Sequence, residues 1–180
     1  QLEWLKKDSL GTDDQLRLLR TTQLAILKAE KAVPANLRAE IDALARKRFP
    51  AKEEPLSREY ARMIAWAGQP GAIETILKAM PEGDENKPLQ IEYMYAVRTI
   101  PTGWTPELNK QVVEWFDKAQ HWRGGASFPG FINFLFDSTV AHFSESEKKL
   151  AYERIPDYAP LTLDQLAENA NRGGYQRAGI

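Results

Sequence analysis

Apolar side chains recur along most of the chain at the three- and four-residue spacing of an α-helix. No comparable stretch of the sequence alternates with the two-residue period of a half-buried strand, so the pattern predicts an all-α fold. The predicted helical faces carry Leu16, Leu19, Gln23, Ile26 and Leu27; Leu37, Ile41, Leu44 and Ala45; Tyr60, Met63, Ile64 and Ala67; Ala72, Ile73, Ile76 and Leu77; Ile91, Met94, Tyr95 and Arg98; and Leu108, Val112, Trp115, Phe116 and Ala119.

Four helix starts are marked by hydroxyl side chains that stand just before an apolar period resumes. Three of them have the spacing of a capping box, in which the two side chains bond each other's backbone N–H groups. These pairs are Thr12 with Gln15, Ser144 with Glu147, and Thr162 with Gln165. Thr105 before Pro106 marks a fourth start, because the N–H that proline lacks has no partner in the first helical turn anyway.

Proline and glycine interrupt the pattern between the predicted helices, at Val33-Pro34, Phe49-Pro50, Gly68 to Gly71, Met80 to Asp84, Ile100-Pro101 and Arg123 to Gly125. These breaks divide the chain into about eight helices of roughly 10 to 18 residues, and pairing neighbours gives a period of roughly 40 residues. We therefore expect a HEAT-like α-α superhelix of about four helical hairpins. An irregular helical bundle is the alternative, because the paired segments share little sequence.

The predicted helix between Phe128 and Phe143 is apolar around most of its circumference. Such a helix is normally enclosed by neighbours, so we expect it to be the inner helix of the last pair, covered by the helix from Ser144 to Ile155. Core packing is favoured here over an aromatic ligand pocket. We expect an N-terminal extension over 1–12, the repeat domain over 13–156, and a linker over 157–180 toward a missing C-terminal domain. The first residue is not Met, which also suggests a fragment.

Composition and charge exclude several classes of function. The chain has 24 Lys and Arg against 25 Asp and Glu, so its net charge of −1 gives no global attraction for nucleic acid or an anionic membrane. The absence of Cys excludes disulfides, thiolate metal sites and covalent haem attachment within these residues. No apolar run approaches the roughly 18 residues of a membrane span. We expect no nucleic-acid partner and no direct membrane insertion.

The residue types that carry chemistry do not form a recognisable catalytic or metal-binding pattern. His121 and His142 are the only histidines and lack a partner at helical metal-ligand spacing. Ser127 lacks the Gly-x-Ser-x-Gly setting of a nucleophile, so we expect it to cap the next helix, after a chain reversal at Gly124-Gly125. We therefore expect no catalytic residue, no cofactor site and no metal site.

Carboxylates are plentiful, but they cluster at helix starts and in polar loops, where they complement the helix dipole or face water. The alternative to a scaffold is a helical carbohydrate-active or hydrolytic domain that uses paired acids such as Glu107 and Asp117. That function requires two carboxylates facing each other across a sugar.

Two tryptophans flank the predicted helix from Thr105 to Gln120 and form the candidate partner surface. Trp104 lies in the turn before this helix, and Trp122 lies at its end beside Arg123. If the three side chains meet on one surface, they have the residue types of an interface hot spot. Packing across the helix ends is the alternative that we favour.

One segment has the character of a family signature. Its residues are Thr102-Gly103-Trp104-Thr105-Pro106-Glu107-Leu108, then Trp115-Phe116, then Gly124-Gly125, Ser127-Phe128 and Gly130-Phe131. This set resembles the HEAT-like helical domain of large multidomain proteins from planctomycete-type bacteria. The resemblance extends from about Leu16 to Pro156, and its specific residues are concentrated in the last third.

The proteins that the chain resembles combine a propeller of the membrane-bound sugar-dehydrogenase type, HEAT-like helices and a haem-binding cytochrome c domain. The resemblance implies a spacer or docking module without catalytic residues, a periplasmic location, and partners that are neighbouring domains or another protein. The last residues, from Gly174 to Ile180, resemble the lead-in to a cytochrome c domain, cut before its Cys-x-x-Cys-His. We expect a non-enzymatic scaffold, whatever redox function the parent protein has.

Overall fold

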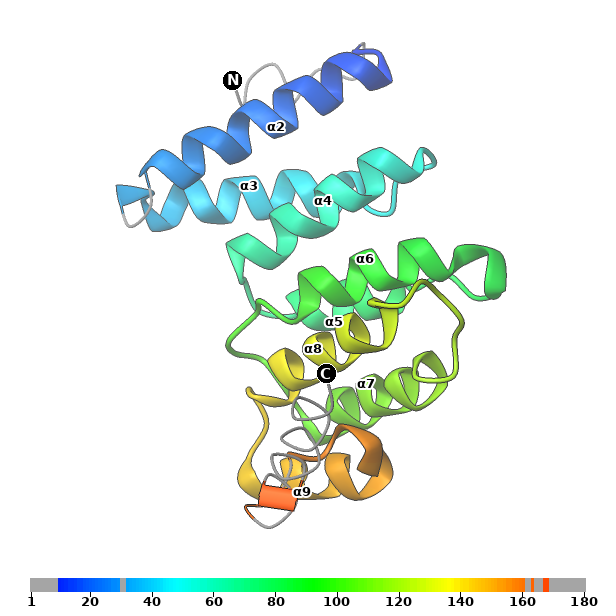
Figure 1. Cartoon of the computed structure of the whole chain (residues 1–180). Helices are drawn as coiled ribbons and strands as arrows, with labels where there is room; N and C mark the ends of the chain where they lie inside the picture. The colour runs from blue at the N-terminus through cyan, green and yellow to red at the C-terminus, as the bar shows by residue number, and fades with distance from the viewer. Residues whose placement is uncertain (1–9, 30–31, 161–162, 164–166, 169–180) are drawn as a thin grey trace, which may run out of the picture.

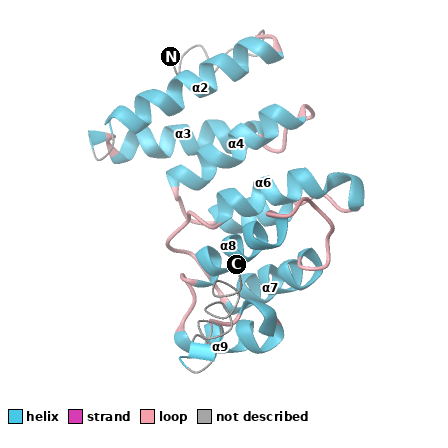
Figure 2. Cartoon of the chain, viewed as in Figure 1, coloured by secondary structure: helices cyan, strands magenta, loops and turns pink. Residues whose placement is uncertain are grey.

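The computed structural model describes residues 10–29, 32–160, 163 and 167–168. In this part of the chain every regular element is helical, as predicted (Figure 2). The α-helices are α2 (Thr12–Ala29), α3 (Ala35–Arg48), α4 (Glu54–Ala67), α5 (Ala72–Lys78), α6 (Lys87–Val97), α7 (Pro106–Ala119), α8 (Phe128–Val140) and α9 (Glu145–Arg154), with short 3-10 turns η2 (Asp84–Asn86) and η3 (Pro156–Tyr158). The predicted breaks at proline and glycine all fall between these helices.

Two of the predicted helix starts are formed by the expected caps. The Thr105 hydroxyl accepts a hydrogen bond from the Leu108 N–H (3.3 Å), and Pro106 is the first residue of α7. Ser144 and Glu147 form a complete capping box at the start of α9, each side chain accepting from the other's backbone N–H. Both helices therefore begin where local sequence specifies, independently of tertiary packing.

Two other predicted caps differ from expectation. The Gln15 amide donates to the Leu10 carbonyl (2.8 Å), and its oxygen accepts from the Tyr60 hydroxyl (3.1 Å), so it ties α2 to α4. Ser127 occupies the N-cap position of α8, but its side chain makes no capping hydrogen bond. The Thr162 start lies outside the described residues.

The helices are stacked so that alternate helices contact each other. α2 packs on α4, α4 on α6, and α6 on α8, while α7 packs on α9. In Figure 1, α2, α4, α6 and α8 lie one below the other, with α3 and α5 packed against α4 and α6. This order agrees with successive hairpins that each contact the next one. The specific HEAT-like superhelix stays a prediction.

The core runs through the whole stack. Its largest fully buried side chains are Tyr60, Tyr93, Phe116, Phe136, Leu19, Ile64, Ile73, Ile76, Met94, Ile100 and Ile132. Most of them come from the predicted helical faces, which confirms the period. Leu27 was predicted on the buried face of α2, but it is 68% exposed, because the face that contacts α4 is centred on Leu19 and Ile26.

The expectation that α8 is enclosed is only half correct. Phe136 is fully buried, and its ring lies 5.2 Å from that of Phe116 and 5.5 Å from that of Tyr152 on α9. Phe131 and Phe134, in contrast, are exposed, because α9 packs mainly on α7 and leaves this side of α8 uncovered.

The ends of the packed region can be compared with the expected domain boundaries. α2 begins at Thr12, next to the expected boundary at 12/13. At the other end Ile155 is buried and the Tyr158 ring lies 5.3 Å from that of Phe136, so packing continues into the first residues of the expected linker. Most of segments 1–12 and 157–180, including the expected lead-in over 174–180, lies outside the described residues.

Candidate functional site

Three exposed aromatic rings on α6 and α8 lie around Arg98, the residue that follows the last residue of α6. Tyr95, Phe131 and Phe134 are 38%, 37% and 49% exposed. The rings of Tyr95 and Phe131 are stacked, with centroids 6.4 Å apart. The Arg98 guanidinium carbon lies 4.0 Å from the Tyr95 ring centroid and 5.2 Å from that of Phe134. We call these four residues the aromatic–arginine face.

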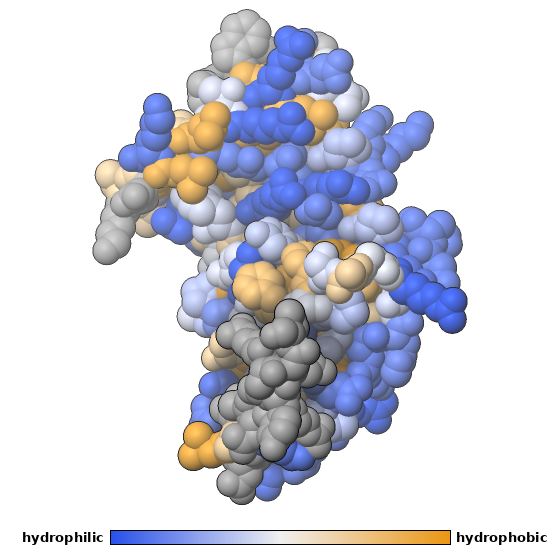
Figure 3. Space-filling model, in the orientation of Figure 1, coloured by the Kyte–Doolittle hydropathy of each residue, from blue (hydrophilic) through white to orange (hydrophobic). Residues whose placement is uncertain are grey.

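Helical geometry explains why these side chains point outward. On α6 the neighbouring Met94 and Val97 are buried, and Tyr95 and Arg98, three residues apart, share the opposite side. On α8 the same spacing separates Phe131 from Phe134, while Ile132, Leu135 and Phe136 face the core. In the space-filling view, apolar surface gathers over α6 near the middle of the molecule, with hydrophilic side chains to its right (Figure 3).

A groove adjoins this face where α3, α4 and α6 meet. It has a volume of about 740 Å³, and Tyr95 lines both the groove and the face. The Arg38 guanidinium carbon lies 4.5 Å from the Trp66 ring centroid, and its Nη1 donates to the Trp66 carbonyl (3.1 Å). The other side chains of note along the groove are Arg62, Gln69 and Thr99.

Arg38 and Arg98 have no carboxylate partner among the described residues. The Arg98 Nε is buried and makes no hydrogen bond. The described residues that line the groove include no carboxylate either. Two arginines are thus held against aromatic rings with their positive charges uncompensated locally.

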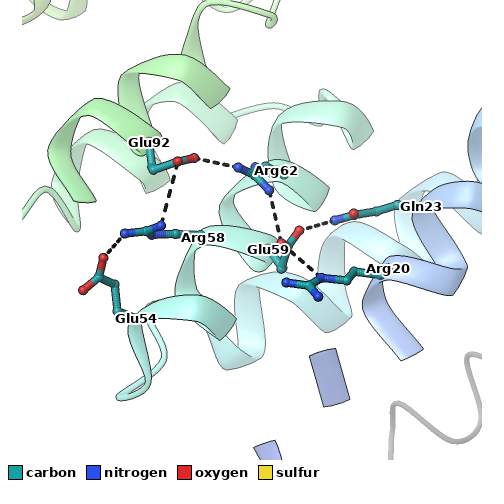
Figure 4. Close-up of polar contacts among 7 residues, drawn as sticks. All are labelled: Arg20, Gln23, Glu54, Arg58, Glu59, Arg62 and Glu92. Carbon is teal, nitrogen blue, oxygen red and sulfur yellow. Dashed lines mark hydrogen bonds and ion pairs between the residues drawn. The ribbon is translucent and has the colours of Figure 1, made fainter. Parts of the chain in front are cut away.

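Next to this groove, α2, α4 and α6 carry charged side chains that pair with one another, and Arg62 belongs both to the groove and to this cluster (Figure 4). We call the six charged residues the charge ladder: Arg20, Glu54, Arg58, Glu59, Arg62 and Glu92. The Glu59 side chain is only 7% exposed, and it accepts from Arg62 (3.1 Å) and Gln23 (2.8 Å). Arg62 also donates to Glu92 (2.7 Å), which joins α4 to α6.

At Arg62 the attraction of neighbouring carboxylates outweighs the cost of burying the guanidinium charge. Burial lowers the pKa of its guanidinium, but the nearby carboxylates of Glu59 and Glu92 more than offset this effect, so the pKa is raised. Arg58 pairs with Glu54 and approaches Glu92 (3.9 Å). The ladder therefore satisfies its own charges and links α2, α4 and α6.

The structure places the candidate partner surface of the sequence at two separate ends of α7. Trp104 stacks on His142 (centroids 5.9 Å apart) and donates from Nε1 to the Ile100 carbonyl (2.8 Å). Trp122 packs edge-on against Trp115 (5.4 Å), and the adjacent Arg123 is exposed. The 14-residue helix between the two tryptophans spans about 21 Å. Trp104 and Trp122 thus make the packing contacts of the alternative, and their role toward a partner stays a prediction.

His142 and Trp104 together complete the C-terminal end of α6. The Nε2–H of His142 donates to the Arg98 carbonyl (2.9 Å), two residues before the Ile100 carbonyl that Trp104 bonds. These carbonyls lie just past the last turn of α6, where intrahelical donors run out. Two side chains from the signature region and the α8–α9 connection thus fix the end of the helix that presents Arg98.

The carboxylates of the enzymatic alternative are not brought together. Glu107 is exposed in the first turn of α7, whereas Asp117 near its end pairs with Arg154 (2.7 Å). About ten residues of helix separate them by roughly 15 Å along the axis, which exceeds the spacing needed across a glycosidic bond. Within the described residues no group of three or more His, Asp or Glu side chains is arranged to hold a metal ion.

Sequence reasoning missed the aromatic–arginine face. The helical period places Tyr95 and Arg98 on one predicted face with Met94. The apolar character of the helix that carries Phe131 and Phe134 predicts that this helix is enclosed. One feature of the sequence could have indicated the face: Tyr95 and Arg98 are three residues apart, and so are Phe131 and Phe134. The helices that carry these pairs, α6 and α8, contact each other.

Among the described residues, no helix is both long enough and apolar enough to cross a membrane. In comparisons with known proteins, no family model, no curated protein and no solved structure matches this chain.

Proposed function

We propose that this chain is a non-catalytic helical scaffold that binds a protein partner, or a neighbouring domain of its own chain, through the aromatic–arginine face. The observation that carries the proposal is the exposure of Tyr95, Phe131 and Phe134 around Arg98 on two adjacent helices. In this proposal the helices form a HEAT-like superhelix, whose layers give a partner an extended surface.

The residue types of the face support protein binding. Single exposed hydrophobic residues are ordinary, but contiguous aromatic surface is typical of interaction sites. Aromatic residues and arginine are enriched in interfaces, and they contribute a large share of binding free energy when a partner excludes water from them. The rings are also held in place, since Tyr95 stacks on Phe131 and Arg98 lies over Tyr95, which reduces the entropy lost on binding.

The setting of the scaffold is a second part of the proposal. By its resemblance in the segment from Thr102 to Phe131, the module belongs to a bacterial, extracytoplasmic, cytochrome c-linked multidomain protein. The coding sequence downstream of codon 180 tests this part directly. We expect a Cys-x-x-Cys-His motif within a few dozen codons, and its absence contradicts the cytochrome link while leaving the docking face untouched.

Site-directed photo-crosslinking tests the docking face. Phe134→p-benzoylphenylalanine places a photoreactive ring on the face, and Lys149→p-benzoylphenylalanine places the same group at an exposed position on α9. The full gene product carrying each substitution is irradiated in the cells that naturally make it, and the adducts are identified by mass spectrometry.

We expect position 134 to yield discrete adducts with one peptide, from a partner or from another domain of the gene product. Position 149 should yield only weak and diffuse products, because this exposed, charged position on α9 lies outside the aromatic–arginine face. Equal yields and equal patterns at the two positions would contradict the proposed function.

A further inference from the structure

We propose that the segment docked on this surface is acidic: a peptide of a partner protein or domain in which carboxylates alternate with aliphatic or aromatic side chains. It would lie along the groove that contains Arg38 and Trp66 and continue onto the aromatic–arginine face at Arg98. This inference rests on the proposed function and specifies the chemistry of the partner.

The charges around the groove determine this chemistry. Arg62, the third arginine here, is already balanced by Glu59 and Glu92. Arg38 and Arg98 are balanced by no described carboxylate. A docked segment that excludes water from these two guanidinium groups must supply the missing negative charge, because an unpaired charge buried in an interface is strongly unfavourable.

Arg98 is prepared for such a contact. Its Nε is already shielded from solvent without a hydrogen-bond partner, and its guanidinium is held over Tyr95 and beside Phe134. With the Nε enclosed, the in-plane N–H donors that remain for a carboxylate are those of the two terminal Nη groups, which can bind it through two parallel hydrogen bonds. The carboxylate thereby supplies the negative charge that no described residue places beside Arg98, and it does so at the terminal Nη groups because the Nε is enclosed.

The rings determine the rest of the segment. Tyr95, Phe131 and Phe134 offer apolar surface on α6 and α8, and Trp66 offers more within the groove. A purely acidic segment would leave this surface exposed to water, whereas one with alternating apolar residues covers it. A single-stranded nucleic acid also stacks on rings, but it needs many cations along its backbone. Among the described residues of this surface, Arg38 and Arg98 are the two arginines without a carboxylate partner.

Fluorescence anisotropy with defined probes tests the inference on the full 180-residue chain. The first probe is a fluorescein-labelled, end-capped ten-residue peptide in which Glu alternates with Leu and Phe. Its matched probes carry Gln or Lys at every Glu position, and a fourth probe is a twelve-nucleotide oligothymidine. The protein variants are Arg98→Gln and Arg38→Gln, with Arg17→Gln as the control because Arg17 is an exposed arginine on α2.

We expect the Glu peptide to bind at least about tenfold more tightly than the Gln peptide, and the Lys peptide to be weakest, since each charged contact is lost or reversed. Arg98→Gln and Arg38→Gln should each weaken the Glu peptide by about tenfold, while Arg17→Gln changes its affinity by less than about twofold. Higher salt should weaken the Glu peptide and leave the Gln peptide almost unchanged. Circular dichroism melts of the three variants establish that they are folded.

Three results overturn the inference: equal affinity for the Glu and Gln peptides, tighter binding of the oligothymidine, or no binding of the Glu peptide at millimolar concentration. Failure of the proposed function is distinguished by the crosslinking yields at positions 134 and 149. If crosslinking is specific to position 134 but the peptides do not discriminate charge, the face binds a partner of other chemistry. If crosslinking is equal at the two positions, docking itself is contradicted.

Discussion

The charge ladder and the aromatic–arginine face share helix α6, but they differ in whether their charged side chains are paired. In the ladder, the buried Glu59 is bonded by Arg62 and Gln23, and Arg62 is shared with Glu92. In the face, the Arg98 guanidinium lies against the rings of Tyr95 and Phe134, and those rings are open to solvent. Each ladder charge has an opposite charge beside it, whereas Arg98 has no carboxylate partner among the described residues.

This difference indicates that the charge ladder stabilises the stack of helices, whereas the aromatic–arginine face is available to a partner. The ladder links α2, α4 and α6 through ion pairs, so its removal should destabilise the folded chain. The face exposes side chains whose contacts with the core are few, so its removal should affect binding far more than folding.

The largest expected effect contrasts two phenylalanines of α8. Phe136→Ala should lower the free energy of unfolding by about 3–5 kcal/mol, because a fully buried ring packed on Phe116 and Tyr152 is replaced by a cavity. Phe134→Ala, two residues away, should lower it by less than about 1 kcal/mol, because that ring is half exposed. Urea titrations followed by circular dichroism measure both values. Similar losses for the two variants would show that Phe134 belongs to the core.

The next effect concerns the carboxylate at the centre of the ladder. Glu59→Gln should lower the free energy of unfolding by about 1–2 kcal/mol, a value moderated by the solvent exposure of Arg20 and Arg62. Glu114→Gln is the control: its pair with Lys110 is exposed and 3.9 Å apart, so we expect a loss below about 0.5 kcal/mol. Thermal and urea unfolding of both variants test the ladder. Equal values would mean that it contributes no more than a surface ion pair.

The helix that carries the exposed phenylalanines also differs in its start from the helix that follows it. Ser144→Ala should destabilise the chain by about 1 kcal/mol, because it removes the capping box of α9. Ser127→Ala should change stability by less than about 0.5 kcal/mol, because Ser127 makes no capping bond to α8.

The Ser144 effect should depend on pH. The hydroxyl and the backbone N–H of Ser144 lower the pKa of Glu147 below its ordinary value of 4.5. A lowered pKa stabilises the folded state above that ordinary value, and this contribution is lost as the pH falls through the folded pKa. The difference between the wild-type chain and Ser144→Ala should therefore be largest near neutral pH and shrink below about pH 4. An unchanged difference at low pH would contradict the role of the Glu147 charge.

The smallest expected effect compares two arginines. Arg98→Gln should change the free energy of unfolding by less than about 0.5 kcal/mol, because the lost ring contacts are offset by removal of a buried unpaired Nε. Arg62→Gln should lower it by about 1 kcal/mol, because it breaks contacts to both Glu59 and Glu92. Chemical denaturation in parallel distinguishes them, and a larger loss for Arg98→Gln would assign Arg98 to folding.

The local features of the fold were predictable because they depend on neighbouring residues in the chain. The Thr105 cap and the Ser144 capping box are set within one helical turn, and the breaks at proline and glycine mark the loops. Which helices contact each other depends on distant segments. Periodicity grouped Tyr95 with Met94, but the packing of α4 and α8 on α6 buries only Met94.

The same reason explains what the sequence could and could not say about the candidate site. The separation of Trp104 from Trp122 follows from the length of one helix, so it was within reach of sequence reasoning. The aromatic–arginine face required knowing that α9 packs on α7 and leaves Phe131 and Phe134 uncovered. That outcome is set by contacts between helices, which hydrophobicity along one helix does not encode.

The central claim is that the exposed rings serve a partner and not the fold. Its most direct test is the crosslinking yield from p-benzoylphenylalanine at position 134 when Tyr95→Ser and Phe131→Ser are combined with it, in a protein shown by circular dichroism to be folded. We predict that the specific adduct is lost while the free energy of unfolding changes by less than about 1 kcal/mol. An undiminished adduct, or a loss of stability as large as that of Phe136→Ala, would contradict the claim.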